Sequence, residues 1–208
     1  MKTLKKKRMA YEEGGMMATK KAAASYVPPE VVKSAIEKVD EVFGAGDFLT
    51  EIALAESSYG ANVKNSNIMQ VMRSGFEDTQ DVSSHPELPK KYKVIEEEFG
   101  IDWPSVTYDQ VKNDPVLNVI AARVFLLNKP GAIPETQEGR AKYWADEYNT
   151  AADKAGTPEY FIDAVEENRK NMPEFGHGGM IDMDETDKEV AKLLIAIYEK
   201  GGILNKIQ

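Results

Sequence analysis

The spacing of apolar residues constrains the fold of this chain more than any other feature of its sequence. Between proline and glycine breaks, apolar side chains recur three and four positions apart, the spacing of one face of an α-helix. No stretch alternates apolar and polar residues for long enough to predict a β-strand. The sequence therefore predicts an all-α fold. The first segment with helical spacing carries Val31, Val32, Ala35, Ile36, Val39 and Phe43.

Prolines, glycines and capping residues mark the expected ends of the helices. Pro29 suits the first turn of a helix that Gly44 and Gly46 are expected to stop. Asp114 is expected to cap the most apolar helix, residues 116–127, which we expect at the centre of the core. Further helices are expected over residues 47–57, from Pro89 to residue 99, and over residues 135–148 and 158–171, with a loop over residues 61–84.

Charge and composition divide the chain into three parts. Residues 1–27 hold seven Lys or Arg against two Glu in a chain of net charge −9, and are expected to form a disordered basic arm. Residues 28–175 are expected to form the helical domain. Residues 176–208 are expected to form a flexible Gly-rich linker and a C-terminal amphipathic helix over residues 184–200. The acidic total argues against nucleic-acid binding.

Several kinds of site and segment are not expected from this composition. The chain has no cysteine and two distant histidines, His85 and His177, so neither a metal site nor another cofactor is expected. The basic residues at positions 2–8 are not followed by the apolar run of a signal peptide. No apolar run approaches the roughly 20 residues that span a bilayer. A protein of this kind that acts outside the cytoplasm would need a route other than general secretion.

Glu56 is distinguished by the residues around it. It follows the apolar turn 52–55 and precedes an expected helix stop at Gly60. A carboxylate near a helix C-terminus faces the negative end of the helix dipole, and apolar neighbours remove water from it, so both effects raise its pKa. A glutamic acid that keeps its proton near neutral pH can protonate a glycosidic oxygen and then act as a base. Glu56 is therefore the candidate catalytic residue.

Three further segments follow Glu56 in a characteristic order. They are Asn67-Ile68-Met69-Gln70-Val71-Met72, Asp114-Pro115-Val116-Leu117-Asn118-Val119 and Trp144-Ala145-Asp146-Glu147-Tyr148-Asn149. Together with Glu56-Ser57 they resemble the motif series of the lytic transglycosylases and goose-type lysozymes. The resemblance covers roughly residues 48–161. It implies a lysozyme-like helical domain that cleaves the β-1,4 bond between N-acetylmuramic acid and N-acetylglucosamine in the glycan strands of bacterial peptidoglycan.

The resemblance also implies a role for each matching residue. Glu56 would be the catalytic acid/base, and Ser57 would position it or the substrate. Met69 and Gln70 would line the glycan cleft, with Gln70 bonding to sugar or N-acetyl groups. Tyr148 and Asn149 would face Glu56, with the tyrosine hydroxyl near the reacting sugar. From the residues alone, Met69 can instead be a core methionine and Tyr148 a buried tyrosine with a satisfied hydroxyl.

The chain departs from the family pattern at three points. Asn67 stands where the family commonly has glycine, and asparagine tolerates left-handed backbone. Ala151 stands where the family has glycine after the Tyr-Asn pair. Gln70 follows Glu56 by only 14 positions, so the loop over the cleft is expected to be short.

The chemistry of cleavage depends on whether a second carboxylate is present. A hydrolase needs one at a defined separation, and Asp47, Glu51, Glu77 and Asp78 are candidates by proximity in sequence alone. Glu51 lies five positions before Glu56, so the two point to different helix faces. A transglycosylase needs none, because the muramyl 6-hydroxyl attacks C1 of its own residue and forms a 1,6-anhydro product. Non-hydrolytic cleavage is favoured, and hydrolysis stays open.

The expected setting is a bacteriophage virion that carries the enzyme to the host cell wall. The N- and C-terminal segments would contact other virion proteins there, since Gly-Gly precedes two apolar residues in both flanks. Two alternatives stay open. One is a structural virion protein whose lysozyme-like domain has lost activity, and the other is an endolysin that stays in the host cytoplasm before lysis.

Overall fold

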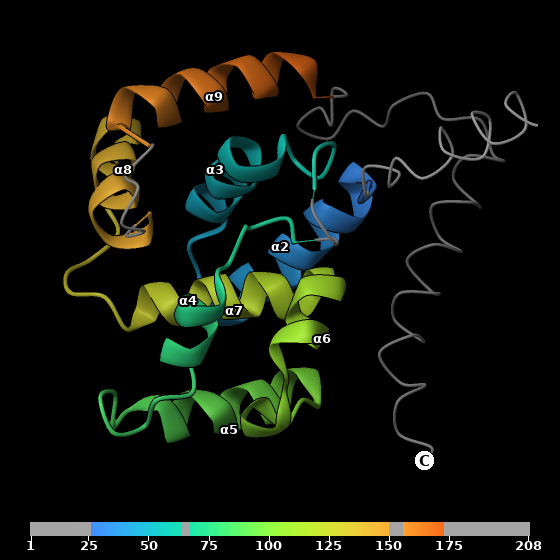
Figure 1. Cartoon of the computed structure of the whole chain (residues 1–208), viewed down its shortest axis with the longest axis vertical. Coiled ribbons are helices and arrows are strands. Elements are labelled where there is room, and N and C mark those ends of the chain that lie inside the picture. The colour runs from blue at the N-terminus through green and yellow to red at the C-terminus, as the bar shows by residue number, and fades with distance from the viewer. Residues whose placement is uncertain (1–25, 64–66, 150–155, 173–208) are drawn as a thin grey trace, which may run out of the picture.

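The computed structural model describes residues 26–63, 67–149 and 156–172 of the chain. Every regular element in these ranges is a helix and none is a β-strand (Figure 1), so the all-α prediction is confirmed. The expected basic arm, apart from Tyr26 and Val27, and the expected linker and C-terminal helix lie outside the described residues. Within the described ranges, no helix combines the length and the apolar character needed to cross a membrane.

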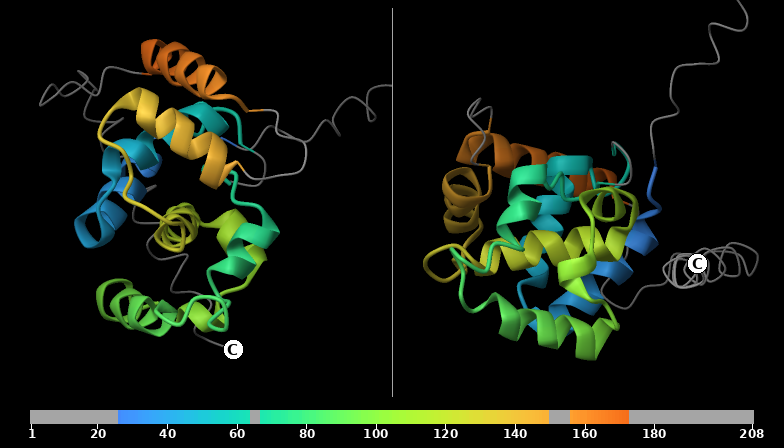
Figure 2. Two further views of the ribbon diagram at one scale, coloured as in Figure 1. Left: turned by 90° about the vertical axis from the view of Figure 1, so that its left-hand side faces the viewer. Right: turned by 60° about the horizontal axis from the view of Figure 1, so that its bottom comes forward.

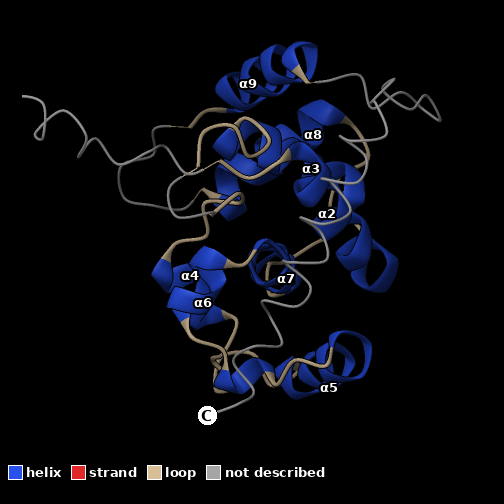
Figure 3. Ribbon diagram, turned by 90° about the vertical axis from the view of Figure 1, so that its right-hand side faces the viewer, coloured by secondary structure: helices blue, strands red, loops and turns tan. Residues whose placement is uncertain are grey.

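The helix α7, Pro115–Leu127, runs through the middle of the domain (Figure 3). As predicted, Asp114 caps it, because its carboxylate accepts hydrogen bonds from the backbone N–H groups of Val116 and Leu117. All residues from Asn118 to Leu126 are buried, so the helix is covered on every side. Three helices that pack on it are α2 (Pro29–Phe43), α4 (Arg73–Asp78) and α6 (Tyr108–Asn113).

A second group of helices packs beside α2 and above α7 in the orientation of Figure 1. Its members are α3 (Gly46–Ser57), α8 (Gln137–Tyr143), the π-helical turn η2 (Trp144–Tyr148) and α9 (Pro158–Asn171). Aromatic rings fill the space between them: the ring of Phe161 lies 6.3 Å from that of Phe48 and 4.9 Å from that of Trp144, centre to centre. This packing joins α3, α9 and η2 around the ring of Phe161.

At the opposite end of the domain lie α5, Leu88–Phe99, and the short 3-10 turn η1, Trp103–Ser105 (Figure 2). Trp103 is fully buried, and its indole N–H donates to the hydroxyl of Thr79, 3.2 Å away. Gly100 ends α5 as expected, in left-handed backbone with φ 67°.

Several expected helix boundaries differ from those observed. Gly44 does end α2, but Gly46 begins α3 instead of stopping α2, because its backbone N–H is bonded to the carboxylate of Asp40. The expected loop over residues 61–84 contains α4, and α6 was not expected at all. Each of these two helices has six residues and one fully or largely buried apolar side chain, which is too little to show a period in the sequence.

The ordered domain begins earlier than residue 28. Val27, which the sequence predicts to lie in the disordered arm, is fully buried, and its backbone N–H donates to the carbonyl of Gly60 over 3.0 Å. The start of the described chain is therefore bonded to the turn that follows α3.

Candidate active site

The carboxyl of Glu56 lies at the penultimate position of α3, half-buried between that helix and η2. Its Oε1 accepts a hydrogen bond of 3.0 Å from the indole Nε1 of Trp144. Burial raises the pKa of Glu56 from its ordinary value of 4.5 to about 7, and the bond from Trp144 opposes this rise. The raised pKa expected from the sequence is confirmed, with burial as its main cause.

Three consecutive left-handed residues follow this helix end: Ser58, Tyr59 and Gly60, with φ of 49°, 55° and 91°. A side chain at position 60 would place its Cβ 2.4 Å from the carbonyl oxygen of Val27, so glycine is required there. Ser57 is buried and holds the turn, since its hydroxyl donates to the carbonyl of Ala53 and accepts from the N–H of Gly60. Ser57 is not among the residues that line the cavity described below, so its hydroxyl stabilises the turn that follows Glu56.

A cavity of about 640 Å³ opens beside Glu56. Of the residues that the resemblance implicates, Gln70, Tyr148 and Asn149 line it together with Glu56, although they come from segments far apart in sequence. The other lining residues are Asn62, Val71, Met72, Ser74, Gly75, Asp78, Phe125 and Lys129. This size is typical of binding clefts for small molecules.

Two buried asparagines, Asn67 and Asn118, hold the loop over residues 67–72, which contains Met69 and Gln70. Asn67 accepts from the backbone N–H of Val71 and donates to its carbonyl, at 3.0 and 3.1 Å. Asn118 on α7 donates to the side chain of Asn67 and accepts from the backbone N–H of Met69, at 2.6 and 2.7 Å. The left-handed residue of the loop is Gln70, with φ 48°, and not Asn67. Asn67 therefore stabilises the loop through its side-chain hydrogen bonds, and position 67 does not require the left-handed backbone that asparagine tolerates.

The expectation that Met69 lines the cleft is wrong. Its side chain is fully buried in the core, as the core-methionine alternative had it. Backbone bonds on both sides fix this direction, because the N–H is held by Asn118 and the carbonyl accepts from the hydroxyl of Tyr148 over 2.7 Å. The next residue, Gln70, lines the cavity, and its side-chain amide donates to the carbonyl of Asn67.

Tyr148 connects the loop to α7 and to Glu56. Its ring meets that of Phe125 edge to face, with centres 5.8 Å apart. Burial raises the pKa of Tyr148 well above its ordinary range, and the nearby carboxylate of Glu56 raises it further. The backbone N–H of Asn149 closes the π-helical turn on the carbonyl of Trp144, at 2.8 Å. Ala151, where the family pattern has glycine, lies outside the described residues.

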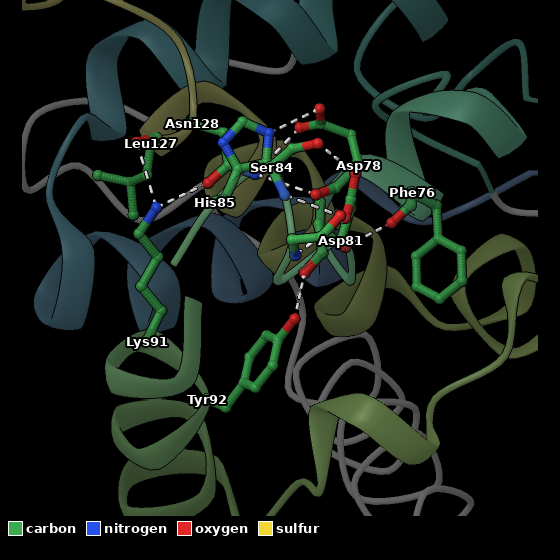
Figure 4. Close-up of polar contacts among 11 residues, drawn as sticks. Phe76, Asp78, Asp81, Ser84, His85, Lys91, Tyr92, Leu127 and Asn128 are labelled. Atoms are coloured by element: carbon green, nitrogen blue, oxygen red, sulfur yellow. Dashed lines mark hydrogen bonds and ion pairs between the residues drawn. The ribbon is translucent and has the colours of Figure 1, made fainter. Parts of the chain in front are cut away.

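Only one of the four candidate second carboxylates lines the cavity with Glu56 in the described chain, and this is Asp78. Its Oδ1 lies 2.9 Å from Nε2 of His85, and its Oδ2 accepts from the amide of Asn128 over 3.0 Å (Figure 4). Glu51 is buried and forms two hydrogen bonds of 2.6 Å with the guanidinium of Arg140. Glu77 is exposed, 4.0 Å from Arg73.

Sequence reasoning assigned no role to Trp144 or Asn118, although both stand inside the quoted segments. Trp144 is 88 positions from the carboxyl it bonds, and Asn118 is 49 positions from Met69, so only the folded chain reveals these contacts. Across the ranges that the structure describes, no group of three or more His, Cys, Asp or Glu residues is placed to hold a metal ion.

Comparison of the chain with models of known protein families, with curated proteins and with solved structures finds no match.

Proposed function

We propose that this chain cleaves the glycan strands of bacterial peptidoglycan, with Glu56 as its acid and base, through a lysozyme-like domain. The observation that carries the proposal is a carboxyl whose pKa is raised to about 7 and which faces a cavity shared with Gln70, Tyr148 and Asn149. A group with this pKa can both donate and accept a proton near neutral pH. The motif resemblance described above supports the same assignment.

The proposed reaction proceeds without water as a reactant. Glu56 donates its proton to the glycosidic oxygen, and the bond from this oxygen to C1 of N-acetylmuramic acid breaks. The 6-hydroxyl of the same residue then attacks C1 and loses its proton to the Glu56 carboxylate, which restores the enzyme. The products are a 1,6-anhydro-N-acetylmuramic acid end and a free 4-hydroxyl on N-acetylglucosamine. The bond from Trp144 to Oε1 leaves Oε2 for both proton transfers.

The surroundings of the other carboxylates favour this route over hydrolysis. Asp78 shares the cavity, but each of its oxygens already has a protein partner, His85 or Asn128. Glu51 is buried and forms an ion pair with Arg140. Neither is a free base for activating water on the far side of a sugar ring, which an inverting hydrolase needs.

The test is digestion of purified peptidoglycan followed by mass spectrometry of the released muropeptides. We expect anhydro ends from the unaltered protein, and a loss of at least about 100-fold in rate for Glu56→Gln, since general acid–base catalysis contributes on that order. Glu77→Gln is the matched control: it makes the same chemical change on the neighbouring α4 at an exposed position. We expect it to leave the rate unchanged.

Each other outcome has a definite meaning. No release by the unaltered protein would overturn the enzyme proposal and support a structural protein with a lysozyme-like domain. Reducing ends in place of anhydro ends would overturn the non-hydrolytic route, and loss of those ends in Asp78→Asn would then identify Asp78 as the second carboxylate. We further propose a bacteriophage particle as the setting, which detection of the chain in purified particles would test.

A further inference from the structure

Lys129 is the one positively charged residue among the described residues that line the Glu56 cavity. It stands two positions after the end of α7, and its backbone N–H donates to the carbonyl of Leu126. Its ammonium lies over the face of the Phe125 ring, 3.9 Å from the ring centre. A cation at the C-terminal end of a helix is also favoured by the helix dipole.

The neighbouring cations Lys91 and Arg123 donate hydrogen bonds to protein acceptors, whereas the ammonium of Lys129 does not. Lys91 donates to the carbonyl of Leu127 and to the side chain of Asn128, at 3.2 and 2.7 Å (Figure 4). Arg123 donates to two backbone carbonyls at the end of α2. Against the described part of the chain, the Lys129 ammonium forms no hydrogen bond and no ion pair, so its three N–H groups are available to a ligand.

Ring contacts join Lys129 to other residues that line the Glu56 cavity. Phe125, which carries the ammonium on its face, meets Tyr148 edge to face, and the hydroxyl of Tyr148 is bonded to the carbonyl of Met69. Tyr148 and Glu56 line the same cavity. Lys129 is therefore joined through Phe125 and Tyr148 to the cavity that Glu56 also lines.

The remaining fixed charge in the cavity, Asp78, does not neutralise Lys129. No ion pair joins the two within 4.0 Å, and both oxygens of Asp78 are bonded to His85 and Asn128. The chain as a whole carries a net charge of −9, so an anionic substrate is repelled at long range and needs a local cation to bind. Lys129 supplies that cation.

We propose that Lys129 binds a carboxylate on the lactyl-peptide substituent of the muramyl residue next to the cleaved bond, and so selects peptidoglycan over neutral glycans. The inference rests on the proposed function. The sugar backbone of the strand is uncharged, and carboxylates enter it only through this substituent: at the lactyl group when the peptide is absent, and along the stem peptide when it is present. A charge-assisted hydrogen bond to such a group distinguishes it from a neutral polymer of N-acetylglucosamine.

The experiment measures binding to full-length protein that carries Glu56→Gln, so that no strand is cleaved. Three ligands are compared: peptide-bearing glycan strands, strands freed of peptide by an amidase, and a neutral hexamer of N-acetylglucosamine. We expect Lys129→Met to weaken binding of a carboxylate-bearing ligand about two- to five-fold, the range for one partly exposed ion pair, and to leave the hexamer unchanged. Loss confined to peptide-bearing strands assigns the carboxylate to the stem peptide, and loss with amidase-treated strands assigns it to the lactyl group.

The matched control is Lys112→Met. This lysine also lies over an aromatic ring, 5.2 Å from the centre of Tyr108, but it lines no part of the cavity. We expect it to bind all three ligands as the parent does. Raising the NaCl concentration is expected to weaken binding of the charged strands in the parent and to have less effect in Lys129→Met.

Equal affinity of the parent and Lys129→Met for both charged strands would overturn the proposal, as would an equal loss for the neutral hexamer or no binding of any ligand. This outcome is separate from failure of the proposed function, which is measured by muropeptide release from protein with Glu56 intact. Release without an effect of Lys129→Met overturns only the inference about Lys129. A Lys129-dependent preference without release overturns only the enzyme proposal.

Discussion

Burial and a hydrogen bond from Trp144 shift the pKa of Glu56 in opposite directions. Burial favours the neutral acid, and the indole N–H of Trp144 favours the carboxylate. Burial prevails, which leaves a pKa of about 7. The protonated form needed for the first step of the proposed reaction is therefore depleted as the pH rises above that value.

Replacing Trp144 by Phe removes the donor that stabilises the ionised form of Glu56. We expect the pKa of Glu56 to rise, so the alkaline limb of kcat/KM on peptidoglycan moves to higher pH. Trp103→Phe is the matched control, because it removes an indole N–H that bonds Thr79, and neither residue lines the cavity. An unchanged limb in Trp144→Phe, or an equal shift in Trp103→Phe, would contradict this account.

The same carboxyl makes folding stability depend on pH. Between pH 4.5 and about 7 the folded state holds the Glu56 proton and the unfolded state does not, so stability falls as the pH rises through this window. The cost above the window is at most about 3 kcal/mol for a shift of this size. Glu56→Gln does not titrate. We expect it to exceed the unaltered protein in stability by about 1–3 kcal/mol at pH 8 and to match it at pH 4, as measured by urea unfolding. A difference that does not change with pH would count against the raised pKa.

The sequence could reveal Glu56 but not the direction of each side chain around it. An apolar helical turn followed by a stop was enough to predict a raised pKa. Met69 and Gln70 are adjacent, yet one points into the core and the other into the cavity. That difference depends on a left-handed residue at position 70 and on bonds from Asn118 and Tyr148, which no local pattern displays.

At the scale of elements, the ion pair between Glu51 and Arg140 joins α3 to α8. The Glu51 side chain is 3% exposed and that of Arg140 is 14% exposed, and their two hydrogen bonds fix the helix that leads into Trp144. Glu51 thus helps to place η2, and it does not line the cavity beside Glu56.

Arg140→Met leaves the buried Glu51 carboxylate with Arg169, 3.8 Å away, as its remaining ionic partner. We expect a loss of up to about 3 kcal/mol in unfolding free energy, because Arg169 is 54% exposed and compensates the buried charge only in part. Glu51→Gln removes the charge itself and is expected to cost less. The double variant Glu51→Gln/Arg140→Met is expected to be more stable than Arg140→Met alone, and the opposite order in urea unfolding would refute this interpretation.

Helices of twelve residues or more could be predicted from the sequence, and the six-residue helices could not. The long helices α2, α3, α5, α7 and α9 present a repeated apolar face or an all-apolar run with capping signals. The short helix α6 depends on a reciprocal cap between Thr107 and Gln110 and on one buried valine. A contact with α7 stabilises it, and that contact is not local in the sequence.

At the scale of the whole molecule, Val27 at the start of the described chain joins the core to the turn that follows Glu56. Val27 is fully buried and bonded to Gly60, four positions after Glu56. A chain that starts at residue 26 keeps this contact, and a chain that starts at residue 28 loses it.

We expect the chain that starts at residue 28 to be about 2–4 kcal/mol less stable than the one that starts at residue 26, from the loss of one buried valine and one backbone hydrogen bond. The chain from residue 26 is expected to keep the cleavage rate of the full protein. Urea unfolding and muropeptide release measure the two effects. Equal stability of the two shortened chains would show that Val27 does not contribute to the core in solution.

The consecutive left-handed residues after α3 indicate where substitutions can raise the thermal stability of this protein. Ser58 and Tyr59 hold a backbone that costs L-residues roughly 1 kcal/mol each, so glycine or asparagine at position 58 relieves a strain already present in the native chain. A laboratory search for heat-resistant variants would find such changes early, two residues from the proposed catalytic acid. Selection for activity would act against those that shift the carboxyl.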